Sequence, residues 1–128
     1  VPNLVVNAGL NWIAGRMDDD NNPADMGWMA IGNKSGNATY GNGGSDPAAG
    51  DTQLGGQLAR VALTTQEASN NTVTYVATFG AGVGTGNVVE AGIFNASSNG
   101  TMLCRTTFPI VSKEAGDTIT ITWAVTVS

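Results

Sequence analysis

The sequence predicts an all-β protein, folded as an antiparallel sandwich or barrel with one short helix near its N-terminal end. The clearest support is the last segment, where large apolar side chains alternate with threonine or alanine from Ile119 to Val127. Alternation of this length is typical of a half-buried strand. The segment from Thr72 to Phe79 alternates in the same way. No helical pattern separates the later strands, which argues against the crossovers that a parallel sheet requires.

The helix is predicted in the N-terminal segment, residues 1–17. Two apolar rows at helical spacing run from Leu4 to Met17, Asn3 is a suitable N-cap, and Gly15 suits a C-terminal turn. Because both rows are apolar, we expect the helix to be covered on more than one side.

Five or six strands are predicted in the rest of the chain, with clusters of turn residues between them. They span Met26–Ile31, Leu58–Thr65, Thr72–Phe79, Val88–Asn95, Met102–Val111 and the alternating segment at the end. The turn Ala68–Asn71 predicts a hairpin between the second and third of these strands. Residues 33–51 (Asn33 to Asp51) form a long loop rich in Gly and Asn, and loops of that length are usually functional or mobile. The length of 128 residues predicts a single domain, residues 1–128.

The composition removes most catalytic and metal chemistry. The chain has no histidine and one cysteine, so histidine-dependent triads, histidine metal sites and cysteine-based zinc sites are excluded. The net charge of −5 has the wrong sign for binding a nucleic-acid backbone. The chain contains no run of 18 apolar residues, so the sequence predicts no membrane span. The lone Cys104 is most simply a core residue, which suits a protein made in a reducing compartment.

Two motifs resemble ligand sites but do not match them. The acidic stretch Asp18–Asp25 lacks the EF-hand pattern, because Pro23 stands at the glycine position and Met29 at the glutamate position. We therefore expect a solvated acidic loop there, with a looser calcium site as the alternative. The glycines of Gly80–Gly86 recur at every second position, unlike a dinucleotide-binding loop, and we expect a strand connection.

A carboxylate-based hydrolase is not excluded by composition, because glycoside hydrolysis needs only two carboxylates. Glu90 is the one carboxylate in a suggestive place, since it lies in a strand that is otherwise apolar on both faces. A buried ion pair with Arg60 or Arg105 accounts for it without catalysis. Lys34 and Lys113 could replace histidine as a base, but neither lies in a serine–lysine motif. We expect no catalytic site.

The chain contains a series of short motifs in this order: Asn7–Asn11, Ala30–Gly32, Gly50–Leu54, Leu58–Val61, Asn71–Tyr75, Glu90–Asn95, Gly100–Thr106 and Asp117–Ser128. Their order resembles a family of small virion proteins of tailed bacteriophages, whose members are described as capsid decoration (cement) or tail-fibre proteins. The resemblance covers nearly the whole chain and is densest from Arg60 to Val127, whereas residues 33–51 are longer and richer in Asn and Gly than the family pattern.

This resemblance implies a β-sandwich of jelly-roll or immunoglobulin-like type, with no cofactor and no enzymatic activity. We expect no metal site either. It implies a capsid decoration protein that binds the outer surface of the major capsid protein lattice and stabilises the head. The chain would be made in the bacterial cytoplasm and reside on the virion, contacting the major capsid protein and neighbouring copies or a homo-oligomer. Nucleic acid and membrane are not expected partners.

The expected contact regions are residues 1–10 (Val1 to Leu10) of the N-terminal segment and the loop at 33–51, because both are polar or irregular and lie outside the regular strands of the sandwich. The candidate contact residues are Val1, Pro2, Asn3, Leu4, Val5, Trp28, Met29 and Tyr40. A different class remains open: a tail-fibre module that recognises a bacterial surface glycan through Trp12, Trp28 and Tyr40. A secreted carbohydrate-binding or hydrolytic domain is a third alternative.

Overall fold

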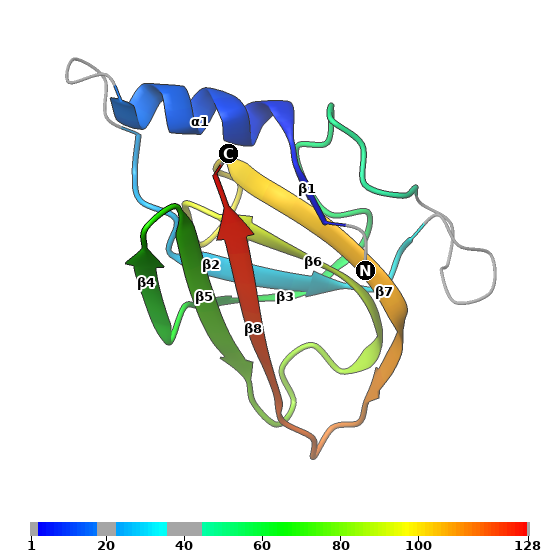
Figure 1. Cartoon of the computed structure of the whole chain (residues 1–128). Coiled ribbons are helices and arrows are strands. Elements are labelled where there is room, and N and C mark those ends of the chain that lie inside the picture. The colour runs from blue at the N-terminus through cyan, green and yellow to red at the C-terminus, as the bar shows by residue number, and fades with distance from the viewer. Residues whose placement is uncertain (1–2, 18–22, 36–44, 128) are drawn as a thin grey trace.

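The computed structural model describes residues 3–17, 23–35 and 45–127, and these form two packed antiparallel sheets with one helix (Figure 1). The five-stranded sheet has the order β1-β7-β6-β2-β3, and the three-stranded sheet has the order β4-β5-β8. The all-β sandwich predicted from the sequence is confirmed. The elements are β1 (Asn3–Val5), α1 (Asn7–Met17), β2 (Trp28–Gly32), β3 (Gln57–Ala62), β4 (Thr65–Ser69), β5 (Thr72–Phe79), β6 (Gly86–Phe94), β7 (Met102–Lys113) and β8 (Ile119–Thr126).

The two strands with the clearest alternation form the centre and one edge of the three-stranded sheet. β5 pairs with β8 along its whole length, and the register brings Tyr75 opposite Trp123 and Phe79 opposite Ile119. The apolar set of each strand faces the core, whereas the threonines lie outside, where Thr72 bonds Thr126 at 2.9 Å and Thr78 bonds Thr120 at 3.1 Å. The predicted inward and outward faces are therefore correct.

The N-terminal segment differs from the prediction. The helix begins at Asn7 instead of Leu4, and Asn3 is in a strand and is not an N-cap. β1 pairs with β7, with Leu4 opposite Arg105 and the Val6 amide donating to the Leu103 carbonyl at 3.2 Å. The prediction failed because this edge strand is stabilised by a partner about a hundred residues away, which no local pattern in residues 3–5 reveals.

The predicted hairpin exists, but its first strand is β4, which the sequence did not predict. The strand predicted to run to Thr65 ends at Ala62, and β3 pairs with β2 in the other sheet. Between β3 and β4 the chain crosses from one sheet to the other: Leu63 donates to the Gly27 carbonyl, and Thr64 donates to the Val76 carbonyl. Asn70, at φ 56, forms the turn between β4 and β5.

The five-stranded sheet is covered on both faces. The main core lies between the two sheets and includes Phe79 and Trp123, whereas a smaller cluster on the opposite face joins Leu54, Phe94 and Met102. β6 is consequently buried from Val88 to Phe94. A strand buried on both faces has no reason to alternate in polarity, which explains why every residue from Val88 to Phe94 except Glu90 is apolar.

Helix α1 lies against β7 through a close contact at Gly9. A Cβ atom at this position would overlap the Leu103 carbonyl group, so the backbone of the helix rests directly on the strand. Glycine is the residue that permits this approach, although it weakens an isolated helix.

We expect Gly9→Ala to destabilise the protein by about 1–3 kcal/mol, because the added methyl group must push α1 away from β7. Helix propensity alone predicts a gain of about 1 kcal/mol, so the sign of the change separates the two effects. Urea unfolding measures it. The control is Gly116→Ala, where a Cβ meets nothing within 4 Å. Equal stability of the two variants would contradict the close contact.

Candidate functional site

Two charged side chains of the interior, Glu90 of β6 and Arg105 of β7, lie together on the outer face of the five-stranded sheet. The Glu90 carboxylate is fully buried, and its Oε1 accepts a hydrogen bond from Arg105 Nε at 3.1 Å and forms an ion pair with Arg105 Nη2, also at 3.1 Å. Arg105 also contacts Asp51 Oδ2 through Nη1 at 3.1 Å and donates to the Lys34 carbonyl at 3.3 Å. Of the two pairings expected for Glu90, the one with Arg105 is confirmed.

Backbone amides complete the coordination of this carboxylate. Gly55 donates to Oε1 at 2.8 Å, while Gly56 and Lys34 donate to Oε2 at 2.8 and 3.2 Å. A Cβ at Gly32 would overlap the carboxylate, so small residues surround it. Both oxygens are thus occupied and enclosed, which leaves neither free to act on a substrate. The pair of adjacent glycines at 55–56 is the sequence signal that could have indicated this site.

The ion cluster of Glu90, Arg105 and Asp51 connects the two regions expected to form the contact surface. Asp51 accepts from the Ala48 amide at 3.0 Å, which shapes the end of the loop at 33–51. The Asn7 amide, at the start of α1, donates to the Ala49 carbonyl at 2.7 Å. The N-terminal segment and the described part of the loop therefore lie side by side, above the buried ion pair.

The candidate contact residues have different environments. Leu4 and Val5 are half-buried in β1, and Trp28 is half-buried against the smaller cluster. Met29 is fully buried in the main core, so its side chain is not at the surface. Trp28, the preceding residue in β2, faces the opposite way, and the predicted apolar run Met26–Ile31 did not distinguish the two faces. Asn3 belongs to β1 by its backbone pairing, and Val1, Pro2 and Tyr40 lie outside the described residues.

Trp12 and Trp28 pack against different clusters of the interior. Trp12 packs against the main core beside a cleft of about 340 Å³, and its indole N–H donates to the Ala24 carbonyl at 2.7 Å. Trp28 packs against the smaller cluster on the outer face of the five-stranded sheet.

A polar cleft of about 600 Å³ lies beside Arg60 on β3. The guanidinium stacks on the Phe94 ring at 3.6 Å, donates to the Ala96 and Asn99 carbonyls, and bonds Gln57. Burial lowers the pKa of Arg60 from its ordinary value. These contacts place Arg60 between β3 and the β6–β7 connection, so it is not the partner of Glu90.

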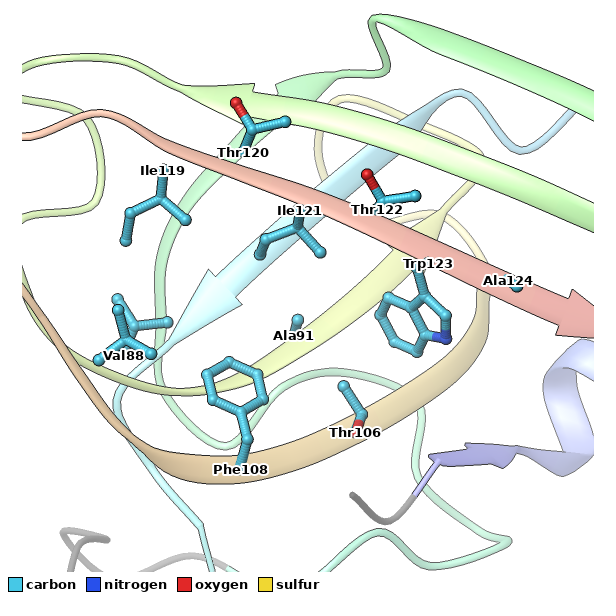
Figure 2. Close-up of a pocket in the computed structure, with 11 residues that line it drawn as sticks. Val88, Ala91, Thr106, Phe108, Ile119, Thr120, Ile121, Thr122, Trp123 and Ala124 are labelled. Atoms are coloured by element: carbon cyan, nitrogen blue, oxygen red, sulfur yellow. The ribbon is translucent and has the colours of Figure 1, made fainter.

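An apolar groove of about 550 Å³ opens between β8 and β7 (Figure 2). Ile119, Ile121 and Trp123 point from β8 towards β7, and Phe108 points back from β7. Val88 and Ala91 of β6 form the floor. No sequence pattern indicates this groove, because the offset of the two sheets is not encoded in any one strand.

Gly80–Gly86 connects β5 to β6 as expected, and Gly82 and Gly84 have positive φ angles of 76° and 71°. Of the acidic stretch, residues 18–22 lie outside the described part, and Asp25 pairs with Arg16 at 3.0 Å. Within residues 3–17, 23–35 and 45–127, no group of three or more Cys, Asp or Glu side chains is arranged to hold a metal ion.

Comparisons with known proteins leave the family open. No protein-family model matches the chain, and a search of curated proteins finds no match. Among the described residues, no helix has both the length and the apolar character needed to cross a membrane.

We expect Glu90→Gln to lower the free energy of unfolding by about 3–5 kcal/mol, because it leaves the buried Arg105 guanidinium without its fully buried carboxylate partner. Urea denaturation measures the change. Glu67→Gln, at an exposed position of β4, is the matched control and should alter stability by less than about 0.5 kcal/mol. A similar small change at Glu90 would show that the ion pair is not required for the fold.

Burial raises the pKa of the Tyr75 phenol to about 12 and, with the nearby Cys104, favours its neutral form. Burial likewise raises the pKa of the Cys104 thiol. Because the folded-state pKa of Tyr75 exceeds the ordinary value of about 10, its contribution to stability is complete below pH 10 and is lost as the pH rises towards 12. Unfolding measured across this range should show a loss of stability that is smaller in Tyr75→Phe. An identical pH profile in both proteins would contradict the assignment.

Proposed function

We propose that this protein is a non-enzymatic binding module, a capsid decoration protein of a tailed bacteriophage that attaches to the outer surface of the major capsid protein. The observation that best supports the proposal is the junction of the N-terminal segment with the loop at 33–51. Both regions were expected to form contacts, and the hydrogen bond from the Asn7 amide to the Ala49 carbonyl makes them neighbours. One contiguous surface can therefore serve as the docking face.

The character of that surface also supports the proposal. Leu10 of α1 is 53% exposed, and the exposed stretch 48–50 consists of two alanines and a glycine. The nearby Arg105 is neutralised below the surface by Glu90 and Asp51. This surface consists of apolar and small residues, and the buried ion cluster holds it in place. Such a surface suits burial against a lattice of identical subunits, where many weak contacts add up.

The chemistry of the interior agrees with a role that is not catalytic. The carboxylate of Glu90 has no free oxygen, and Cys104 is buried with its thiol pKa raised, which disfavours the reactive thiolate. Lys113, considered above as a possible base, is buried and donates to the Gly80 and Asp117 carbonyls, both at 2.7 Å. These groups serve the fold.

The proposal is tested by counting copies in purified particles. A decoration protein should be present in hundreds of copies, in a fixed ratio to the major capsid protein, as measured by quantitative mass spectrometry. A few tens of copies or fewer, located on the tail by electron microscopy, would favour the tail-fibre alternative. Absence from purified particles would reject both.

We expect Leu10→Arg to reduce occupancy on particles at least tenfold, because it places a charge in the docking face. The matched control is Ile110→Arg, which has a similar exposure of 42% and lies seven residues along β7 from Leu103, the residue that α1 contacts. Both variants should unfold at the temperature of the unaltered protein. Equal occupancy for the two variants would contradict the assignment of the face, independently of the copy number.

A further inference from the structure

Within the described residues, no strand pairs with the outer edge of β8, so the backbone groups of this edge are open along the apolar groove. Val127, just beyond the strand, donates its amide to Asn71 and accepts from the Asn71 side chain, so its backbone faces β5. Because the direction alternates along a strand, the backbone groups of Thr120, Thr122 and Ala124 point to the opposite, open side. The side chains of Thr120 and Thr122 lie on the outer face of the three-stranded sheet. All three residues nevertheless line the groove, because their backbone groups point into it.

β8 is also the least protected edge in the described part of the molecule. β1 is only three residues long, β3 carries Arg60, and β4 carries Glu67. β8 has eight residues, none of them charged and none of them proline. Long uncharged edges favour pairing with another strand, and proteins usually block them with charges, prolines or short length. The other three edges have such protection, whereas β8 does not.

The groove beside this edge has room for a strand because β7 bends away. Val88 pairs with Val111 and Glu90 with Thr107, so β7 contains two extra residues in this interval, which includes Pro109. Such a bulge redirects a strand and interrupts its pairing. All the lining residues are uncharged, and the walls are mainly aliphatic or aromatic. An occupant must therefore insert apolar side chains.

The arrangement of the sheets favours a single strand over a folded second copy. On the open side of β8, the five-stranded sheet continues through β7 and β1 (Figure 1). If a second copy paired through its own β8, its five-stranded sheet would need the space that β7 and β1 already fill. The net charge of −5 on each copy adds electrostatic repulsion.

Charge at one end of the groove adds a further requirement. The connection from β7 to β8 carries the exposed acidic residues Glu114 and Asp117, whereas the Lys113 ammonium between the sheets is enclosed by carbonyl groups. This end lies at the start of β8. A strand that pairs antiparallel to β8, the slightly more stable arrangement, ends there. A basic residue after its apolar stretch would meet the two carboxylates.

We propose that β8 and this groove bind one extended segment of another polypeptide, with apolar side chains at alternate positions followed by a lysine or arginine. The segment adds a fourth strand to the three-stranded sheet and forms hydrogen bonds to the open backbone groups of β8, a known mode of peptide recognition. The proposal concerns a different surface from the docking face at Leu10 and does not depend on the capsid role.

The test selects ligands from a displayed library of random twelve-residue peptides on the full chain. The enriched sequences should alternate apolar and polar residues and end in a basic residue. A synthetic peptide of the enriched sequence should slow amide hydrogen exchange at Thr120, Thr122 and Ala124 at least tenfold. Failure to enrich any peptide, enrichment without alternation, or protection at other residues would overturn the proposal.

Two matched variants locate the binding. Val111, which lines the groove, is 43% exposed, and its neighbour Ile110, which does not, is 42% exposed. Val111→Lys should weaken peptide binding at least tenfold, and Ile110→Lys should change it less than twofold. Glu114→Gln should reduce the salt dependence of binding. Equal binding by the two lysine variants would reject the groove, and a concentration-dependent dimer abolished by Val111→Lys would assign it to a second copy.

Discussion

The buried carboxylate of Glu90 is the constraint on which the arrangement of the outer face depends. An ion in the interior is tolerated only when its charge and its lone pairs are matched, and here the matching groups come from three separate parts of the chain: Arg105 on β7, Lys34 after β2, and Gly55 and Gly56 before β3. The long connection between β2 and β3 is therefore held at both ends. This brings Leu54 onto Phe94 and covers the second face of the sheet.

The parts of the fold that could be predicted are those where a single strand contains the whole signal. β5 and β8 each have one face in the core and one in solvent, so their sequences alternate and show both faces directly. β4 has the sequence TQEAS and is exposed along its length, which leaves no apolar pattern to find. β1 is likewise defined by its pairing with β7 and by nothing local. Propensity was overridden in both cases by a tertiary partner.

The candidate surfaces, like the strands, could be predicted only where the signal is local. Composition indicated that the loop at 33–51 lies outside regular strands, but its contact with the N-terminal segment, through Ala49 and Asn7, depends on where the ion cluster holds the loop. The sequence narrowed the partner of Glu90 to two arginines, and the choice required the pairing register of β6 with β7, which contains an irregularity. Met29 was misplaced because an apolar run in a strand covered on both faces does not reveal which residues are accessible.

The placement of the basic residues has a consequence for the survival of the protein outside a cell. Proteases of the trypsin type cut after lysine or arginine and need the chain in an extended, accessible form. Arg105 and Lys113 are enclosed, and the guanidinium of Arg60 is bound to two carbonyls and a glutamine. At these three positions, cleavage must wait for the chain to open. The lifetime of the β core in a protease-rich medium is then governed by how often and how fast it unfolds.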